Sequence, residues 1–241
     1  MKQKPLHPSM ENFLKGEVIL IDKPLQWTSF DAVKKIRILT GVSKVGHAGT
    51  LDPLATGLLI ICTGSFTKQI SMYMGMEKEY TGSFTVGAKT STYDLESEPE
   101  DFKDTSNISM ENIYETTKKF TGEIFQTPPI HSAIKKDGKP AYLLARKGEE
   151  IILEPRKITI SLFEITKILL PEIHFKVVCS TGTYIRSLAN DFGNALGTGG
   201  YLSSLRRTKI GNFSVSEALS LKQFEDKIKE MKAISERQTN T

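Results

Sequence analysis

The spacing of apolar and polar residues along the chain predicts a mixture of strands and helices. A continuous apolar run, Leu58–Cys62, is typical of a buried strand, whereas residues 78–87 alternate as in a half-buried strand. Residues 156–170 and 172–180 also alternate, which predicts a long antiparallel pair that turns at Pro171. Together with the helices described next, these strands predict an α+β fold.

Capping residues mark the ends of the predicted helices. Thr28 followed by Asp31 has the pattern of a capping box, and it predicts a helix over residues 29–40 that stops at Gly41. Ser109 is a suitable N-cap for a second helix. We expect further elements as follows: helices over 67–74, 110–121 and 140–148, a helix that the segment 181–186 opens and that runs to about 196, a helix from 221 onward, a strand over 17–21, a loose N-terminal arm over 1–12 and a linker over 213–221.

The segment Gly46–Gly57 concentrates turn-forming residues around one carboxylate. Asp52 directly precedes Pro53, which disfavours a helical conformation at the aspartate, and the surrounding glycines permit tight turns. A stiff loop that carries a carboxylate beside a core strand is a good mount for a catalytic group. An Asp-Pro pair by itself, however, is far more often a structural turn.

Charge is modest overall but unevenly distributed. The 241 residues include 32 Lys and Arg against 28 Asp and Glu, and the net charge of +4 permits a polyanionic partner without demanding one. Acidic residues gather over 94–104, and basic residues gather over 135–147 and again over 206–209. One charge run alone is usually a solvated face, but segregated runs favour a field that steers a charged ligand.

Cysteine and histidine are too sparse to suggest a metal site. Cys62 and Cys179 lie in apolar runs and predict buried thiols in a reducing compartment. No cysteine or histidine pair has the spacing of metal ligands, so we expect no zinc site. The pattern contains no signal-like or membrane-spanning segment, which predicts a cytoplasmic protein.

Several stretches resemble the motifs of one enzyme family. The string Gly46-His47-Ala48-Gly49-Thr50-Leu51-Asp52-Pro53-Leu54-Ala55-Thr56-Gly57 is similar to the signature loop of the TruB family of tRNA pseudouridine synthases. Ile21-Asp22-Lys23-Pro24 followed by Trp27-Thr28-Ser29 resembles the N-terminal motif of that family, with Gln26-Trp27 in place of the usual glycine. Further similar stretches are the segment around Tyr80, Thr90–Asp94 (followed by Leu95-Glu96 where a glycine is usual), Thr181–Arg186 and Tyr201–Arg207.

The resemblance implies a domain organisation. It covers nearly the whole chain and implies a pseudouridine synthase domain over residues 13–221, with a mixed, mainly antiparallel sheet flanked by helices. It also implies an inserted basic thumb at about 127–157 that grips RNA, with His131 where the family usually has tyrosine. Residues 222–241 would be a C-terminal helix and polar tail, with no room for the RNA-binding PUA module that many relatives carry.

The resemblance further implies roles for individual residues. Asp52 corresponds to the nucleophile, Arg186 to its arginine partner and Tyr80 to the residue that stacks on the target base. Substrate-binding roles are implied for His47, which contacts RNA where the base leaves, for Leu205, an apolar wall of the base pocket, and for Gly49, Tyr184 and Lys23. Apart from the resemblance, a strand tyrosine, a lone loop histidine and a single arginine are more often structural.

The implied reaction is isomerisation of uridine 55 in the T-loop of tRNA to pseudouridine by a monomer, with no DNA or membrane partner. This chemistry implies neither a cofactor nor a metal. Such an enzyme flips the nucleotide out of the folded RNA, and attack at the sugar or at C6 of the ring both remain open. The alternative is a non-catalytic RNA chaperone or a subunit of a guide-RNA particle. A metal-dependent hydrolase is disfavoured because metal ligands are scarce.

Overall fold

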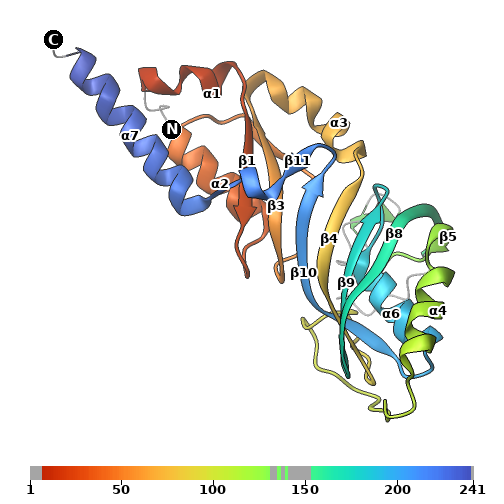
Figure 1. Ribbon diagram of the computed structural model, residues 1–241. Helices are drawn as coiled ribbons and strands as arrows, with labels where there is room; N and C mark the ends of the chain where they lie inside the picture. Colours follow the sequence, from red (N-terminus) through yellow and green to blue (C-terminus); the bar gives the residue numbers. More distant parts are fainter. Residues whose placement is uncertain (1–6, 131–134, 137–138, 141–152, 240–241) are drawn as a thin grey trace. The chain divides into compact units, whose positions relative to one another are not determined.

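The structure is a computed structural model that describes residues 7–130, 135–136, 139–140 and 153–239 (Figure 1). Its internal contacts divide the chain into two compact units. Unit 1 comprises Met1–Lys78 and Arg206–Thr241, and unit 2 comprises Glu79–Leu205.

Unit 1 combines a small sheet with helices. Its strands follow the order β12-β1-β3-β10, with β2 paired to β3 and β11 paired to β10. The pairs β1–β3, β2–β3 and β10–β11 are antiparallel, and β1–β12 is parallel. The described elements, in which η denotes a 3₁₀ helix, are η1 (Pro8–Met10), α1 (Glu11–Lys15), β1 (Val18–Lys23), α2 (Ser29–Thr40), β2 (Val45–Ala48), β3 (Ala55–Thr63), η2 (Gly64–Gln69), α3 (Ile70–Gly75), the end of β10 (Gly200–Ile210), β11 (Phe213–Ser214), η3 (Val215–Glu217), β12 (Leu219–Ser220) and α7 (Leu221–Thr239).

The main core of unit 1 lies between its strands and the helices α2 and α7, which run side by side in Figure 1. Ile21 of β1, Ile36 of α2 and Phe224 of α7 are among its buried residues. Met10 and Phe13 are buried in the same core, so the expected loose arm is wrong from residue 8 onward. Apolar side chains at these positions gain more from burial than a free arm gains in entropy.

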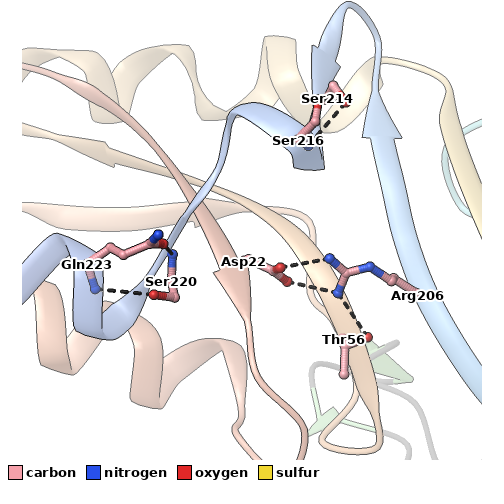
Figure 2. A network of polar contacts seen from close by, with 7 residues as sticks. All are labelled: Asp22, Thr56, Arg206, Ser214, Ser216, Ser220 and Gln223. Atoms are coloured by element: carbon pink, nitrogen blue, oxygen red, sulfur yellow. Dashed lines mark hydrogen bonds and ion pairs between the residues drawn. The ribbon is translucent and has the colours of Figure 1, made fainter.

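The expected linker over residues 213–221 is also wrong. This segment forms β11, η3 and β12, and Leu219 of β12 pairs with Ile21 of β1. A capping box formed by Ser214 and Glu217 stabilises the start of η3, the 3₁₀ turn between the two short strands. Figure 2 shows the hydrogen bond between the hydroxyls of Ser214 and Ser216. It also shows Ser220 hydrogen-bonded to Gln223 at the start of α7.

Arg206 ties three strands of unit 1 together. Its guanidinium donates two hydrogen bonds to Asp22 of β1, at 3.0 and 2.7 Å, and a longer one of 3.4 Å to Thr56 of β3 (Figure 2). This bidentate geometry is the strongest form of an arginine–carboxylate contact. The next residue, Arg207, is 1% exposed, so the expectation that the whole run 206–209 forms a steering surface is wrong for Arg207.

Unit 2 is built on a second run of strands, in the order β10-β4-β9-β8-β5. The pairs β5–β8 and β8–β9 are antiparallel, and the two-residue strands β6 and β7 form a separate antiparallel pair. The described elements are β4 (Lys78–Val86, from Glu79 onward in this unit), α4 (Met110–Lys119), β5 (Gly122–Gln126), β6 (Lys135–Lys136), β7 (Lys139–Pro140), β8 (Arg156–Leu169), β9 (Glu172–Cys179), α6 (Ile185–Ala195) and the beginning of β10.

A cluster of phenylalanines forms part of the core of unit 2. Phe84 of β4 stacks on Phe175 of β9 with ring centroids 4.2 Å apart, and it contacts Phe163 of β8 edge-on at 6.1 Å. Phe192 of α6 packs against Phe84 and Phe163, with ring centroids 5.6 and 5.5 Å apart, and so joins α6 to the strands. Aromatic pairs in these geometries add to the free energy of burial.

The main sequence predictions about the fold are confirmed. The fold is α+β, with a sheet that contains antiparallel pairs and the parallel pair β1–β12, and α2 begins and ends where the capping pattern predicts. Cys62 and Cys179 are buried thiols, as predicted, and burial raises the pKa of Cys62 to about 11. In the described part of the chain no helix combines the length and the apolar character needed to cross a membrane.

The thumb is only partly described. Lys136 pairs with Lys139 and Lys135 with Pro140, so Pro140 belongs to a strand and does not begin a helix. His131 and the rest of the helix expected up to residue 148 lie outside the described residues.

Candidate functional site

Asp52 lies in the loop of unit 1 between β2 and β3, as the sequence predicts. Gly49 has a φ of +89°, a value that favours glycine, and it lets the chain turn directly after β2. The carbonyl oxygen of Asp52 accepts a hydrogen bond of 3.1 Å from the amide of Ala55, which closes the turn into β3. Asp52 as a whole residue is half-buried.

The residues on either side of Asp52 are held by the segment that leads into α2. The hydroxyl of Ser29 accepts a hydrogen bond of 2.9 Å from the amide of Leu51 and donates one of 3.2 Å to the carbonyl of the same residue. The amide of Gln26 donates a hydrogen bond of 2.8 Å to the carbonyl of Pro53. The loop is therefore bound to a fixed part of the fold both before and after its carboxylate.

Arg207 also holds this loop in place through hydrogen bonds. Its guanidinium donates hydrogen bonds to the carbonyls of Leu58, Gly49 and Thr50, at 2.8, 3.1 and 3.4 Å. Gly57 leaves room for this arrangement, because a Cβ there would lie 2.3 Å from the carbonyl oxygen of Arg207. Arg207 is thus a buried residue that stabilises the backbone of the loop.

Lys23 places a buried ammonium beside this loop. Its side chain is 0% exposed, and its Nζ donates to the carbonyls of Trp27 and Pro24 at 2.6 and 3.0 Å. Burial lowers the pKa of Lys23 to about 8, while the negative charge of Asp52 acts in the opposite direction. A positive charge near the carboxylate favours its ionised form.

His47 is the third ionisable residue of this region, and it lies on β2 opposite Ile61 of β3. Burial lowers its pKa, and the positive charge of Arg207 lowers it further. Both effects favour a neutral imidazole at physiological pH, which can stack or hydrogen-bond without adding charge.

In unit 2, Arg186 lies in the first turn of α6 and is 6% exposed. Its Nε lies 3.7 Å from a carboxylate oxygen of Asp94, and its Nη1 donates to the carbonyl of Thr92 at 3.3 Å. Tyr93, between these two partners, has a φ of +63°, an unusual value for a residue other than glycine. The turn directs both the Thr92 carbonyl and the Asp94 carboxylate toward the guanidinium.

A side-chain amide fixes the residues just before Arg186. Gln126 at the end of β5 accepts a hydrogen bond from the amide of Tyr184 at 2.8 Å and donates one to the carbonyl of Tyr184 at 3.1 Å. The hydroxyl of Ser187 donates to the carbonyl of Thr127 at 2.8 Å. The start of α6 is therefore anchored on both sides of Arg186.

Tyr80 and Leu205 lie on β4 and β10, which are neighbouring strands. Tyr80 is 8% exposed and Leu205 is half-buried. The strands approach closely, because a Cβ on Gly82 would meet the carbonyl oxygen of Ser204 at 2.1 Å. A hydrogen bond of 2.8 Å between the hydroxyls of Ser83 and Ser204 joins the strands at the same level.

The predicted site residues fall into two groups. The loop region of unit 1 holds Lys23, His47, Gly49 and Asp52, whereas unit 2 holds Tyr184 and Arg186 at the start of α6 and Tyr80 and Leu205 on adjacent strands. Sequence reasoning did not assign a role in the site to the supporting residues Ser29, Asp94, Gln126 and Arg207. Among the described residues no cluster of three or more His, Cys, Asp or Glu could hold a metal ion.

Comparison with known proteins identifies close relatives of this chain. The N-terminal domain model of the TruB family of pseudouridylate synthases matches residues 37–185, and the model of the tRNA pseudouridylate synthase B C-terminal domain matches residues 186–238. A tRNA pseudouridine synthase B from Flavobacterium johnsoniae is 57% identical over 225 residues, which cover 90% of this chain and 98% of that protein. One from Phocaeicola vulgatus is 48% identical over 219 residues, which cover 88% of this chain and 93% of that protein.

Several solved structures have a fold similar to that of this chain. A chain in the crystal structure of a Cbf5–Nop10–Gar1 complex superposes with a TM-score of 0.71 at 29% identity, covering 91% of this chain and 56% of that chain. A chain in an H/ACA ribonucleoprotein bound to a substrate RNA containing 2′-deoxyuridine has a TM-score of 0.68 at 25% identity, covering 94% of this chain and 58% of that chain. The chain thus spans a little over half the length of these solved chains.

Proposed function

Because the chain belongs to the TruB family of pseudouridylate synthases, we propose that it converts uridine 55 in the T-loop of tRNA to pseudouridine. The observation that carries the proposal is Asp52, which stands in the family's signature loop and is held there by hydrogen bonds to the residues on both sides. The identity of 57% to a tRNA pseudouridine synthase B, over nearly all of that protein, supports tRNA as the substrate.

The reaction is an isomerisation that needs no added group. The bond between N1 and C1′ of the uridine breaks, a bond between C5 and C1′ forms, and the hydrogen on C5 leaves to solvent while N1 takes a proton. Because these atoms are shielded inside folded RNA, the nucleotide must first be flipped out of its stack. Asp52 attacks either C1′ or C6 as an ionised carboxylate, and the nearby charge of Lys23 favours that ionised form.

The family motifs supply the remaining roles in the proposal. Arg186 is the catalytic cation, Tyr80 stacks on the target base and Leu205 forms an apolar wall for it. His47, Gly49, Tyr184 and Lys23 belong to the substrate-binding set. The basic thumb holds the T-arm mainly through phosphate contacts and shape, so the partner is tRNA, with neither DNA nor a membrane involved.

Tritium release tests this proposal. Unmodified tRNA that carries tritium at C5 of uridine is incubated with the protein, and the modified position is then mapped. We expect the wild-type protein to release tritium from uridine 55 only, and Asp52→Asn to bind the RNA but release none. Asp226→Asn is the matched control, because it makes the same substitution at an exposed position of α7 and should not affect release.

Each contrary result would refute a different part of the proposal. Normal release by Asp52→Asn would contradict the nucleophile assignment, and modification at another uridine would contradict the position. A second candidate function is that of a non-catalytic RNA-binding protein or guide-particle subunit. The structural likeness to chains in H/ACA and Cbf5 complexes supports it. T-arm binding without any tritium release by the wild-type protein would favour that second function.

A further inference from the structure

We propose that Ser29 is a positioning residue that fixes the direction in which Asp52 presents its carboxylate; this inference rests on the proposed function. Ser29 is 2% exposed, and its hydroxyl engages both backbone polar groups of Leu51, the residue directly before Asp52. Leu51 is itself 3% exposed, so water cannot replace the hydroxyl without a rearrangement.

Ser29 can serve as an anchor because its own position is fixed. It is the first residue of α2, and the preceding Thr28 forms a capping box with Asp31, with both reciprocal hydrogen bonds at 3.0 Å. The next turns of the helix bury Ala32 and Ile36 in the core of unit 1. The rigid helix thus holds a hydroxyl at a defined place, and the loop is bound to it.

The geometry restricts the backbone on both sides of Asp52. On the N-terminal side, one hydroxyl accepts from the amide and donates to the carbonyl of Leu51, which sets the orientation of both peptide groups of that residue. On the C-terminal side, Gln26 binds the carbonyl of Pro53. Little freedom is left for Asp52 itself.

Such restraint matters for chemistry more than for folding. A nucleophile has to be held within about 0.5 Å of its productive geometry, and a misplacement of about 1 Å can cost roughly 100-fold in rate. Loss of the hydroxyl would free the Leu51 peptide groups to seek other partners and would carry the neighbouring carboxylate with them. The effect would appear in the chemical step and leave RNA binding largely intact.

Ser29→Ala tests the proposal in a single-turnover assay of tritium release at saturating T-arm RNA, together with the dissociation constant for that RNA. We expect the rate constant to fall about 10- to 100-fold and the dissociation constant to change less than about twofold. Ser29→Cys, which fills nearly the same space with a weak hydrogen-bonding group, should also be slow. Ser29→Thr keeps the hydroxyl and should retain more of the rate than either variant.

Thr40→Val is the matched control for the loss of a buried hydroxyl from α2. The Thr40 hydroxyl also donates to a carbonyl, that of Ile36 at 2.8 Å, and accepts from an amide, that of Val42 at 3.3 Å, but it has no hydrogen bond to the Asp52 loop. We expect Thr40→Val to lower thermal stability as Ser29→Ala does and to leave the rate constant unchanged.

The results separate this inference from the proposed function. If the wild-type protein releases tritium, Asp52→Asn does not, and Ser29→Ala and Ser29→Cys keep the wild-type rate, the inference fails and the function stands. The inference also fails if Thr40→Val loses as much rate as Ser29→Ala, because the loss would then follow stability alone. No release by the wild-type protein would overturn both.

Discussion

The guanidinium of Arg186 lies against the carboxylate of Asp94, with Nε 3.7 Å from Oδ2 and both side chains about 95% buried (6% and 5% exposed). Asp94 begins the acidic run that the sequence places over residues 94–104, yet it is a buried counter-charge and not part of a solvated face. Tyr93, directly before Asp94, has an unusual backbone conformation with a φ of +63°. Strained backbone of this kind is common where a fold holds a functional group.

Breaking this pair should reduce both stability and activity. Asp94→Asn removes one partner of a buried ion pair, which typically costs about 3–5 kcal/mol, and we expect a loss of that order in the free energy of unfolding measured with urea. We also expect slower tritium release with RNA binding largely retained, because Arg186 would lose the contact that orients it. Glu98→Gln, at an exposed position nearby, is the control. Unchanged stability and rate in Asp94→Asn would show that the pair is dispensable.

The elements that the sequence predicted correctly are those with strong local signals. The capping residues Thr28 and Gly41 define α2, and the apolar run Leu58–Cys62 lies within β3. The segments that were predicted wrongly depend on distant partners. Met10 is buried against a core that residues more than 200 positions later complete, and β12 pairs with β1. Neither contact leaves a periodic pattern in the short segment itself.

The same distinction applies to the candidate site. The loop around Asp52 was predicted because its motif is continuous in sequence. Its supports are not, since Ser29 lies 22 positions from Leu51 and Arg207 lies 158 positions from Gly49. Arg207 also resembled part of a basic surface, because a sequence shows the sign of a charge but not its burial.

Lys23 should make stability depend on pH in a specific window. Burial lowers its pKa from 10.5 to about 8, so between these values the unfolded chain binds more protons than the folded one. The contribution of Lys23 to stability therefore rises with pH across this window, by at most about 1.4 kcal/mol per pH unit. Below about pH 8 both states are protonated and the contribution is constant.

The measurement compares the wild-type protein with Lys23→Met by urea unfolding at several pH values from about 7 to 10. We expect the difference in free energy of unfolding to move in favour of the wild-type protein as the pH rises. Lys34→Met removes an amino group from an exposed position of α2 and is the control. A difference that stays constant for Lys23→Met across the window would contradict the lowered pKa.

Gln26 is expected to be a strained position. Its φ is +65° and its side chain is exposed. In the N-terminal motif of the family, Gln26-Trp27 stand in place of the usual glycine. A left-handed conformation costs a residue with a Cβ about 1–2 kcal/mol, and a glycine at this position would avoid that cost. Glycine loses more conformational entropy on folding, however, which offsets about 0.5–1 kcal/mol of the stabilisation. We expect Gln26→Gly to be stabilising by about 0.5–1 kcal/mol and to raise Tm by about 1–4 °C.

Gln26→Ala separates backbone strain from loss of the side chain, because it removes the amide group but keeps the Cβ. It should give no increase in Tm. Both variants keep the backbone amide that binds the carbonyl of Pro53, so the support of the Asp52 loop is retained. If Gln26→Gly and Gln26→Ala change Tm equally, strain at this residue is not the cause.

The hairpin of β6 and β7 should account for part of the salt dependence of RNA binding. It carries Lys135, Lys136 and Lys139 within six residues, and the proposed function places this basic segment on the phosphates of the T-arm. Each lysine that contacts a phosphate adds about 1 to the slope of log affinity against log salt concentration. We expect replacement of all three by Gln to lower affinity and to reduce that slope by about 2–3, measured between about 50 and 200 mM salt.

A triple replacement of exposed lysines elsewhere, at Lys118, Lys119 and Lys222, changes the net charge by the same amount and is the control for general electrostatics. It should weaken binding slightly through the long-range field and leave the slope nearly unchanged, because no counterions are released from contacts that do not form. If both triple variants reduce the slope equally, the charge of the whole protein governs binding. A slope that neither variant changes would exclude the hairpin from the RNA interface.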